Sequence, residues 1–126
     1  MARAATRSRA RRPQHLKPQS AILVLTALPE REGAEALARE LLAARLAACI
    51  QIGATVQSLY HWRGQIETGD ELPIAIKTRA GLYSRLEIAI RRRHPYELPE
   101  IIAVPISNGF APYLDWIAAE TADEGA

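Results

Sequence analysis

The side chains of this sequence that are suited to metal binding are few and lie in separate segments. The candidate nitrogen and sulfur ligands are His61, His94 and Cys49, and the carboxylates of Glu97 and Glu100 follow His94 closely along the chain. Imidazole and thiolate groups favour copper and zinc, whereas carboxylates favour harder ions. These residues support the hypothesis of a divalent-ion site, with copper or zinc as candidates and no obligatory cofactor.

Each candidate ligand also has an ordinary structural interpretation. Cys49 follows two alanines in an apolar segment, where a lone thiol is usually a small core residue. Alternation along a strand directs His61 to the face opposite Tyr60 and Trp62, where solvent, a subunit interface or an ion would meet it. His94 either binds a metal or forms hydrogen bonds to the carbonyls that end a helix.

The loop carboxylates and the aromatic residues have ordinary structural interpretations as well. Glu97 and Glu100 are candidate ligands, solvated loop residues or ion-pair partners, and Lys77 is a possible partner of Glu100. Amphipathic aromatic rings favour places where the ring and its polar edge meet different surroundings. We therefore interpret a second set of residues as packing, cleft or interface positions: Tyr60, Trp62, Lys77, Tyr113 and Trp116.

Catalytic patterns are missing from the sequence. Ser58 and Ser107 have no neighbouring base that would activate them, and neither a glycine-rich phosphate loop nor a zinc-protease pattern occurs. We expect no enzymatic activity.

Length and composition predict one compact domain. The chain has 126 residues, of which 48% are hydrophobic, and this is enough for one core but too short for two ordinary domains. A single cysteine excludes an intramolecular disulfide and favours a reducing compartment, so we expect a cytoplasmic protein. No segment approaches the roughly 20 apolar residues of a membrane helix, so we expect no membrane insertion.

Positive charge is concentrated at the N-terminus. Residues 1–20 contain six basic and no acidic side chains, while the remaining residues carry 10 basic and 14 acidic ones. We predict a disordered basic tail over residues 1–19, either plainly solvated, electrostatically adhesive or an organellar targeting segment. The rest of the chain has a net charge of about −4, which argues against specific nucleic-acid binding.

The elements that position these residues follow from hydrophobic periodicity. Residues 21–27 form an apolar strand, a helix begins at Pro29 and carries its apolar stripe to Leu46, and residues 47–63 form a long strand that bends at Gly53. The predicted elements after it are a return strand over 66–78 with Pro73 at an edge or bulge, a helix from Gly81 to Arg93, a strand over 101–106 and a short terminal helix.

The order β-α-β-β-α-β predicts an α+β domain of the ferredoxin-like type, with a four-stranded antiparallel sheet, two helices on one face and an extra C-terminal helix. We place this domain at residues 20–121 and expect residues 122–126 to fray. The uncovered sheet face and the long hairpin would expose apolar surface in a lone copy, which predicts self-association.

Several ordered strings resemble the CutA divalent-cation tolerance family. They are Leu46 to Cys49, Ser58 to Gly64, Lys77 to Thr78, His94 to Glu100, and Asn108 to Trp116 with its Asn-Gly and Tyr-Leu-Asp-Trp segments. The resemblance spans about residues 21–120 and implies a homotrimer whose architecture is similar to that of PII signalling proteins. It also implies tolerance of copper and other divalent cations, and so a role in metal homeostasis.

The resemblance also locates the family's copper ligands in this chain. Copper-binding relatives use a cysteine at the end of the first strand and two consecutive histidines before a Pro-Tyr pair. The matching positions here are Thr26, Arg93 and His94, and the arginine cannot act as a ligand. The resemblance therefore leaves an alternative function, a PII-like signalling or scaffolding trimer that binds a small molecule or a protein in its intersubunit clefts.

Overall fold

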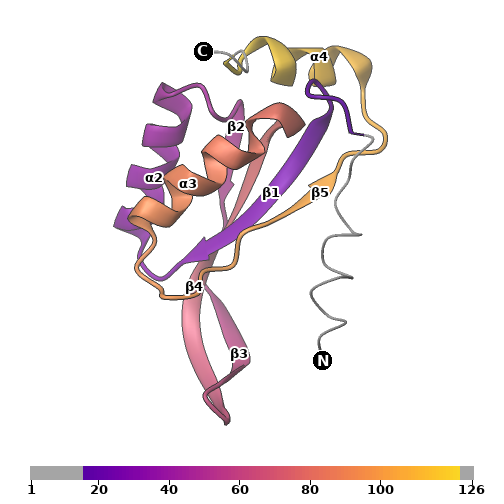
Figure 1. Ribbon diagram of the computed structural model, residues 1–126. Helices are drawn as coiled ribbons and strands as arrows, with labels where there is room; N and C mark the ends of the chain where they lie inside the picture. The colour runs from indigo at the N-terminus through magenta and orange to yellow at the C-terminus, as the bar shows by residue number, and fades with distance from the viewer. Residues whose placement is uncertain (1–15, 123–126) are drawn as a thin grey trace.

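The computed structural model describes residues 16–122, which form a single antiparallel sheet flanked by helices (Figure 1). The elements in chain order are β1 (Ala21–Leu28), α2 (Arg31–Ala43), β2 (Cys49–Ile52), β3 (Val56–Trp62), β4 (Gln65–Arg79), a 3-10 turn η1 (Ala80–Leu82), α3 (Tyr83–Arg93), β5 (Ile102–Pro105) and α4 (Ala111–Ala119). None of the helices in this part of the chain is long and apolar enough to cross a membrane.

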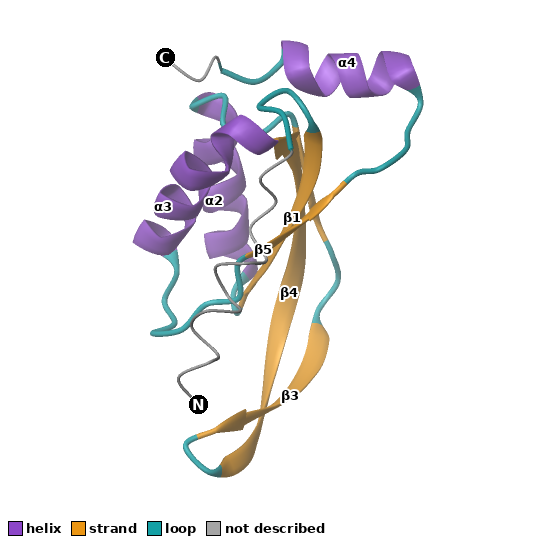
Figure 2. Cartoon of the chain, turned by 45° about the vertical axis from the view of Figure 1, so that its right-hand side comes forward, coloured by secondary structure: helices purple, strands orange, loops and turns teal. Residues whose placement is uncertain are grey.

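The sheet has the strand order β2-β4-β1-β5, and β3 pairs with β4 beyond the end of β2. All of these pairings are antiparallel. Figure 2 shows α2 and α3 together on one face of the sheet, while the hairpin of β3 and β4 projects beyond it. The predicted ferredoxin-like fold with an additional C-terminal helix, α4, is therefore confirmed.

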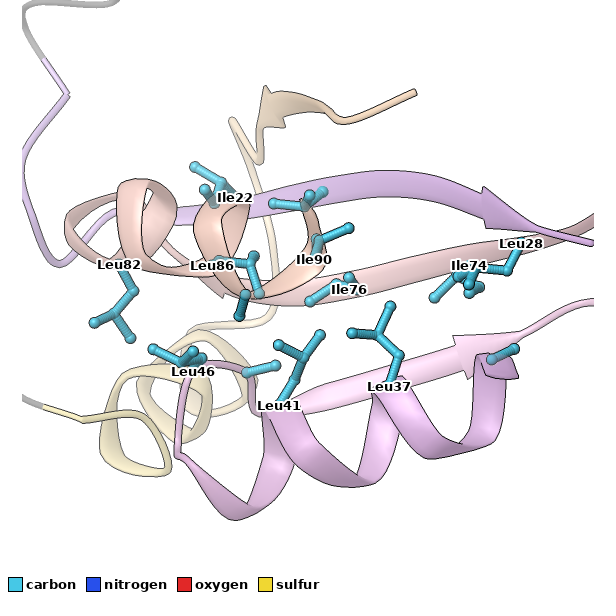
Figure 3. Packing of buried hydrophobic residues seen from close by; sticks show 14 residues of the cluster. Ile22, Leu28, Leu37, Leu41, Leu46, Ile74, Ile76, Leu82, Leu86 and Ile90 are labelled. Carbon is cyan, nitrogen blue, oxygen red and sulfur yellow. The ribbon is translucent and has the colours of Figure 1, made fainter. Parts of the chain in front are cut away.

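The core lies between the sheet and the two helices (Figure 3). Alternate residues of β1 and β4 face it, and the stripes of α2 and α3 supply their buried leucines, alanines and isoleucine. The fully buried members are Val24, Ala34, Leu41, Ile76, Leu82, Leu86 and Ile90. Because the helices cover only one face, Leu23 and Leu25 of β1 stay half-buried on the other.

The end of α2 differs from the prediction, because the helix stops at Ala43 although the apolar stripe continues to Leu46. Arg45 adopts a left-handed backbone conformation with φ of 61°, and its N–H donates to the Leu42 carbonyl. The N–H of Leu46 donates to the carbonyl of Leu41 at 3.0 Å. These two bonds define a Schellman motif, which turns Leu46 back into the core with an arginine where glycine is usual.

The predicted long strand over 47–63 is divided into β2 and β3, so the sheet has five strands rather than four. The break follows Gly53, whose N–H donates to the Pro73 carbonyl at 2.8 Å. A strand residue directs its N–H and C=O to the same side, so the missing N–H of Pro73 faces the break. Pro73 is therefore tolerated inside β4, where it also pairs with Ala27 of β1.

A buried arginine joins the two ends of the described chain. Arg79, at the end of β4, is only 1% exposed. Its Nε donates to Thr121 Oγ1 at 3.2 Å, its Nη1 to the Pro18 carbonyl at 3.4 Å, and its Nη2 to the Ala122 carbonyl. We call this arrangement the Arg79 clasp. It connects the segment before β1 to the segment after α4.

The two predicted end segments fall mostly outside the described residues, namely at residues 1–15 and 123–126. Residues 16–19 of the predicted tail lie against the fold. Leu16 packs on the core, and the Pro18 carbonyl also accepts a hydrogen bond from the Gly81 N–H at 3.0 Å.

Candidate functional site

A cleft forms where the β3–β4 hairpin meets the loop between α3 and β5. The hairpin turns through Arg63 and Gly64, whose φ values of 52° and 79° match a two-residue type I′ turn. The loop returns from α3 through Pro95 to Glu100 and supplies the opposite wall. The enclosed volume is about 710 Å³, and its lining includes Ser58, Tyr60, Trp62, Arg63, Glu71, Tyr96, Glu97, Leu98 and Glu100.

The register of the hairpin decides which side chains face the cleft. Tyr60 lies opposite Glu67 and Trp62 opposite Gln65, so both rings project from one face of the ribbon. His61 also borders the cleft, but alternation directs its side chain to the other face, opposite the exposed Ile66. The predicted separation of His61 from the two aromatic rings is therefore present in the structure.

Arg63 joins the two walls of the cleft. Its guanidinium carbon lies 5.2 Å from the centre of the Trp62 ring, and its Nη2 donates to Glu97 Oε1 at 3.3 Å. Both members of this ion pair are largely exposed, so it contributes at most about 1 kcal/mol to stability. Its main effect is to place one carboxylate and one aromatic ring around a guanidinium.

His94 stands behind the cleft and uses both of its ring nitrogens. Nδ1 accepts a hydrogen bond from the Tyr96 N–H at 3.2 Å, so Nε2 carries the proton and donates to the Ala27 carbonyl at 2.7 Å. Its backbone N–H also donates to the Ile90 carbonyl. His94 therefore fastens the end of α3 to β1, and metal binding through its ring requires one of these bonds to break.

Glu71, which the sequence did not single out, joins Glu100 at the border of a second cavity. That cavity has a volume of about 530 Å³ and extends over β1, β2 and β4. The two cavities share Ala27, Ser58, Glu71 and Glu100. Three carboxylates thus surround the cleft, where the sequence predicted two. The third carboxylate becomes apparent only from the hairpin register. Glu71 lies opposite Val56, on the same face of the hairpin as Tyr60 and Trp62.

The other predicted site residues lie at the far end of the sheet, near α4. Lys77 is the register partner of Cys49, and its Nζ donates to Gln51 Oε1 at 3.4 Å and lies 5.6 Å from the centre of the Tyr113 ring. Tyr113 in turn stacks on Trp116 with the ring centres 5.5 Å apart. Lys77 thus contacts Gln51 and Tyr113 instead of Glu100. The cleft and this cluster are two separate sites.

Thr26, which matches a copper-ligand position of the family, is 2% exposed, and its hydroxyl has no hydrogen-bond partner among the described residues. We expect Thr26→Val to raise the free energy of unfolding by about 1 kcal/mol, because an isosteric methyl removes an unpaired buried hydroxyl. Urea denaturation at one protein concentration measures this change.

Thr78→Val is the matched control. Thr78 is fully buried on the neighbouring strand, but its hydroxyl donates to the Leu46 carbonyl at 2.8 Å. This variant should lose about 1 kcal/mol, since the Leu46 carbonyl is left unpaired. Changes of the same sign in the two variants would contradict the explanation.

Comparisons with a family model and with curated proteins all find similarity to CutA proteins. A family model described as "CutA1 divalent ion tolerance protein" matches residues 22–120. The "Divalent-cation tolerance protein CutA" of Thermus thermophilus is 37% identical over 99 residues, which cover 79% of this chain and 96% of that protein. "Protein CutA, chloroplastic" of Arabidopsis thaliana is 35% identical over 83% of this chain, which spans 58% of the length of that relative.

Solved structures agree with the sequence matches. CutA1 from Oryza sativa superposes with a TM-score of 0.80 at 35% identity, covering 82% of this chain and 95% of that one. CutA1 from the psychrotrophic bacterium Shewanella sp. SIB1 has the same TM-score at 41% identity, covering 85% and 99%. The matched segments include the hairpin and loop that form the cleft.

Proposed function

The chain belongs to the CutA1 divalent ion tolerance family, and from this premise we propose that it is a nonenzymatic homotrimer that binds divalent metal ions weakly or conditionally in metal homeostasis. The observation that carries the proposal is that Glu71, Glu97 and Glu100 all line one cleft. Within the described residues, no three potential ligands are grouped closely enough to hold an ion together, which favours loosely held ions. Carboxylates of this kind hold hydrated divalent ions through few direct bonds, which gives low affinity.

The residues at the family's copper-ligand positions do not fit a copper site in this chain. Thr26 presents a buried hydroxyl, Arg93 is a cation that pairs with Glu40, and both ring nitrogens of His94 are engaged. No soft ligand lies among these three positions. The proposal therefore concerns loosely held ions at the cleft carboxylates.

Exposed apolar surface supports the trimer. On the sheet face away from α2 and α3, Ile102 and Val104 of β5 are 50% and 44% exposed beside the half-buried Leu23 and Leu25. On the hairpin, Leu59 and Ile66 are 64% and 70% exposed. A second copy would bury these side chains and pair the free strand edges.

The alternative function is a PII-like trimer that binds a small molecule or a protein in clefts. It is favoured by the same cleft, because Tyr60, Trp62 and Tyr96 give it aromatic walls that a hydrated metal ion does not need. For the location of the protein we propose the cytoplasm, although the Arabidopsis relative is named chloroplastic.

Calorimetric titration of the full chain with zinc(II) and copper(II) tests the leading proposal, with light scattering of the same sample to establish the trimer. We expect saturable binding with dissociation constants on the order of 10⁻⁴–10⁻³ M, the range of weak carboxylate sites. In the variant Glu97→Gln with Glu100→Gln, the affinity should fall at least about tenfold, because two of the three cleft carboxylates lose their charge.

Asp70→Asn is the matched control, because Asp70 is adjacent to Glu71 in β4 but alternates to the other face of the hairpin. It should bind as the unmodified chain does. A monomer at micromolar concentration would contradict the assembly, and equal binding by all variants would contradict the metal site. Binding lost only in His94→Ala would restore the histidine as the ligand.

A further inference from the structure

The cleft and the second cavity adjoin each other, and we refer to the two together as the groove. Their shared lining of Ala27, Ser58, Glu71 and Glu100 places two carboxylates at the junction between them. The hairpin of β3 and β4 projects beyond the rest of the sheet in both ribbon views (Figures 1 and 2). Ser58 lies in β3 and Glu71 in β4, so the shared lining includes both strands of the hairpin. Groups that enter either cavity meet the same two carboxylates.

These two carboxylates have no cationic partner in the part of the chain that the structure describes. Within the described residues, neither Glu71 nor Glu100 forms an ion pair within 4.0 Å, whereas Glu97 is paired with Arg63. The pKa of Tyr96 is raised, first by burial of the phenol and then by electrostatic interaction with Glu71 and Tyr60. The charge of Glu71 therefore acts on Tyr96 within the groove.

The groove already holds one guanidinium in a specific geometry. Arg63 lies over the Trp62 ring at 5.2 Å and donates to Glu97 at 3.3 Å, so an aromatic face and a carboxylate share one planar cation. Tyr60, Tyr96 and the two unpaired carboxylates repeat these chemical elements next to it. Guanidinium groups are weakly hydrated, stack on aromatic rings and pair with carboxylates through parallel hydrogen bonds.

We propose that this groove binds a small organic cation, a guanidinium on an aliphatic stem, with the cation between Glu71 and Glu100 and the stem along Tyr60 and Tyr96. A hydrated metal ion gains little from aromatic walls, whereas a guanidinium gains from both the rings and the carboxylates. The guanidinium site therefore shares Glu71 and Glu100 with the proposed metal site, and its aromatic walls extend the function of the cleft to organic ligands.

Guanidinium groups have two sources here. One is a free small molecule, and the other is the chain itself, since residues 1–15 contain five arginines and no acidic residue. Fifteen extended residues reach at most about 50 Å, which exceeds the roughly 26 Å length of an eight-residue strand such as β1. Both sources present the same guanidinium group, and the experiment below distinguishes them.

Calorimetric titration of the full chain with agmatine, a guanidinium on a four-carbon amine, tests the proposal, and putrescine and zinc(II) serve as comparisons. We expect saturable agmatine binding that weakens about tenfold or more in Glu71→Gln with Glu100→Gln, because charge-assisted hydrogen bonds are lost. Tyr96→Leu should weaken agmatine without changing zinc(II) binding, and Asp70→Asn should bind agmatine normally.

A full chain with its five N-terminal arginines replaced by serine separates the sources. Tighter agmatine binding in that variant shows that the arginines of the chain compete for the groove, and unchanged binding assigns the site to free ligands. Agmatine heats that do not saturate in either chain would overturn the proposal. So would binding that survives loss of both carboxylates, equal affinity for putrescine, or a groove whose variants alter only the oligomeric state.

Discussion

The Arg79→Ala variant is expected to lose about 3 kcal/mol of the free energy of unfolding, a large fraction of the stability of a domain of this size. The guanidinium is almost fully buried and donates to two backbone carbonyls and one hydroxyl. Its removal leaves the Pro18 and Ala122 carbonyls without this donor and opens a cavity below α4. Urea denaturation at a fixed protein concentration measures the loss.

Arg79→Lys separates the effect of charge from that of geometry. Lysine keeps the positive charge, but a single ammonium cannot replace a planar fork whose three nitrogens reach three acceptors. We expect it to lose a large part of the same free energy. Stability equal to the unmodified chain in both variants would contradict the structural role of the Arg79 clasp.

The Leu41→Ala variant is expected to lose about 3–4 kcal/mol, which combines the lost transfer free energy of the side chain with the cost of the cavity. Leu41 is fully buried at the centre of the layer between α2 and the sheet, where Figure 3 shows it between Leu37 and Leu46. Leu41 is also the C3 residue of the Schellman motif, in which Leu46 is the C″ residue. Both side chains belong to the same buried cluster, so truncating Leu41 weakens the packing at the end of α2.

The adjacent residue supplies the matched control. Leu42 has the same side chain in the same helix but is 40% exposed. Leu42→Ala should change the free energy of unfolding of the isolated subunit by less than about 1 kcal/mol. If the chain assembles through this surface, the variant will instead show a loss that depends on protein concentration. Equal, concentration-independent losses at the two positions would show that the helix is rotated from its described orientation.

Most of the fold could be predicted because local patterns and global packing agree. The apolar run of β1 and the stripes of α2 and α3 follow the periods of their elements, and the order of elements then permits few topologies. The ends of elements were less predictable. Arg45 ends α2 in a conformation that glycine usually adopts, so the sequence contained no stop signal before Leu46.

The candidate site was predicted only in part, because it depends on contacts between segments far apart in the sequence. Tyr60, Trp62, Glu97 and Glu100 do meet at one cleft, but Lys77, Tyr113 and Trp116 form a second cluster at the other end of the sheet. Glu71 was missed since its role comes from the hairpin register and from no motif. The hydrogen bonds of His94 to Ala27 and Tyr96 could not be predicted from the sequence either.

The Arg79 clasp also has a consequence for local opening of the chain. One side chain serves acceptors at Pro18 and Ala122, so fraying of either end withdraws a partner from a buried cation. The cost of that exposure is shared by both ends, which makes their openings one cooperative event instead of two independent ones. Amide protons near Ser20 and near Thr121 should therefore exchange with solvent at linked rates, although a hundred residues separate them.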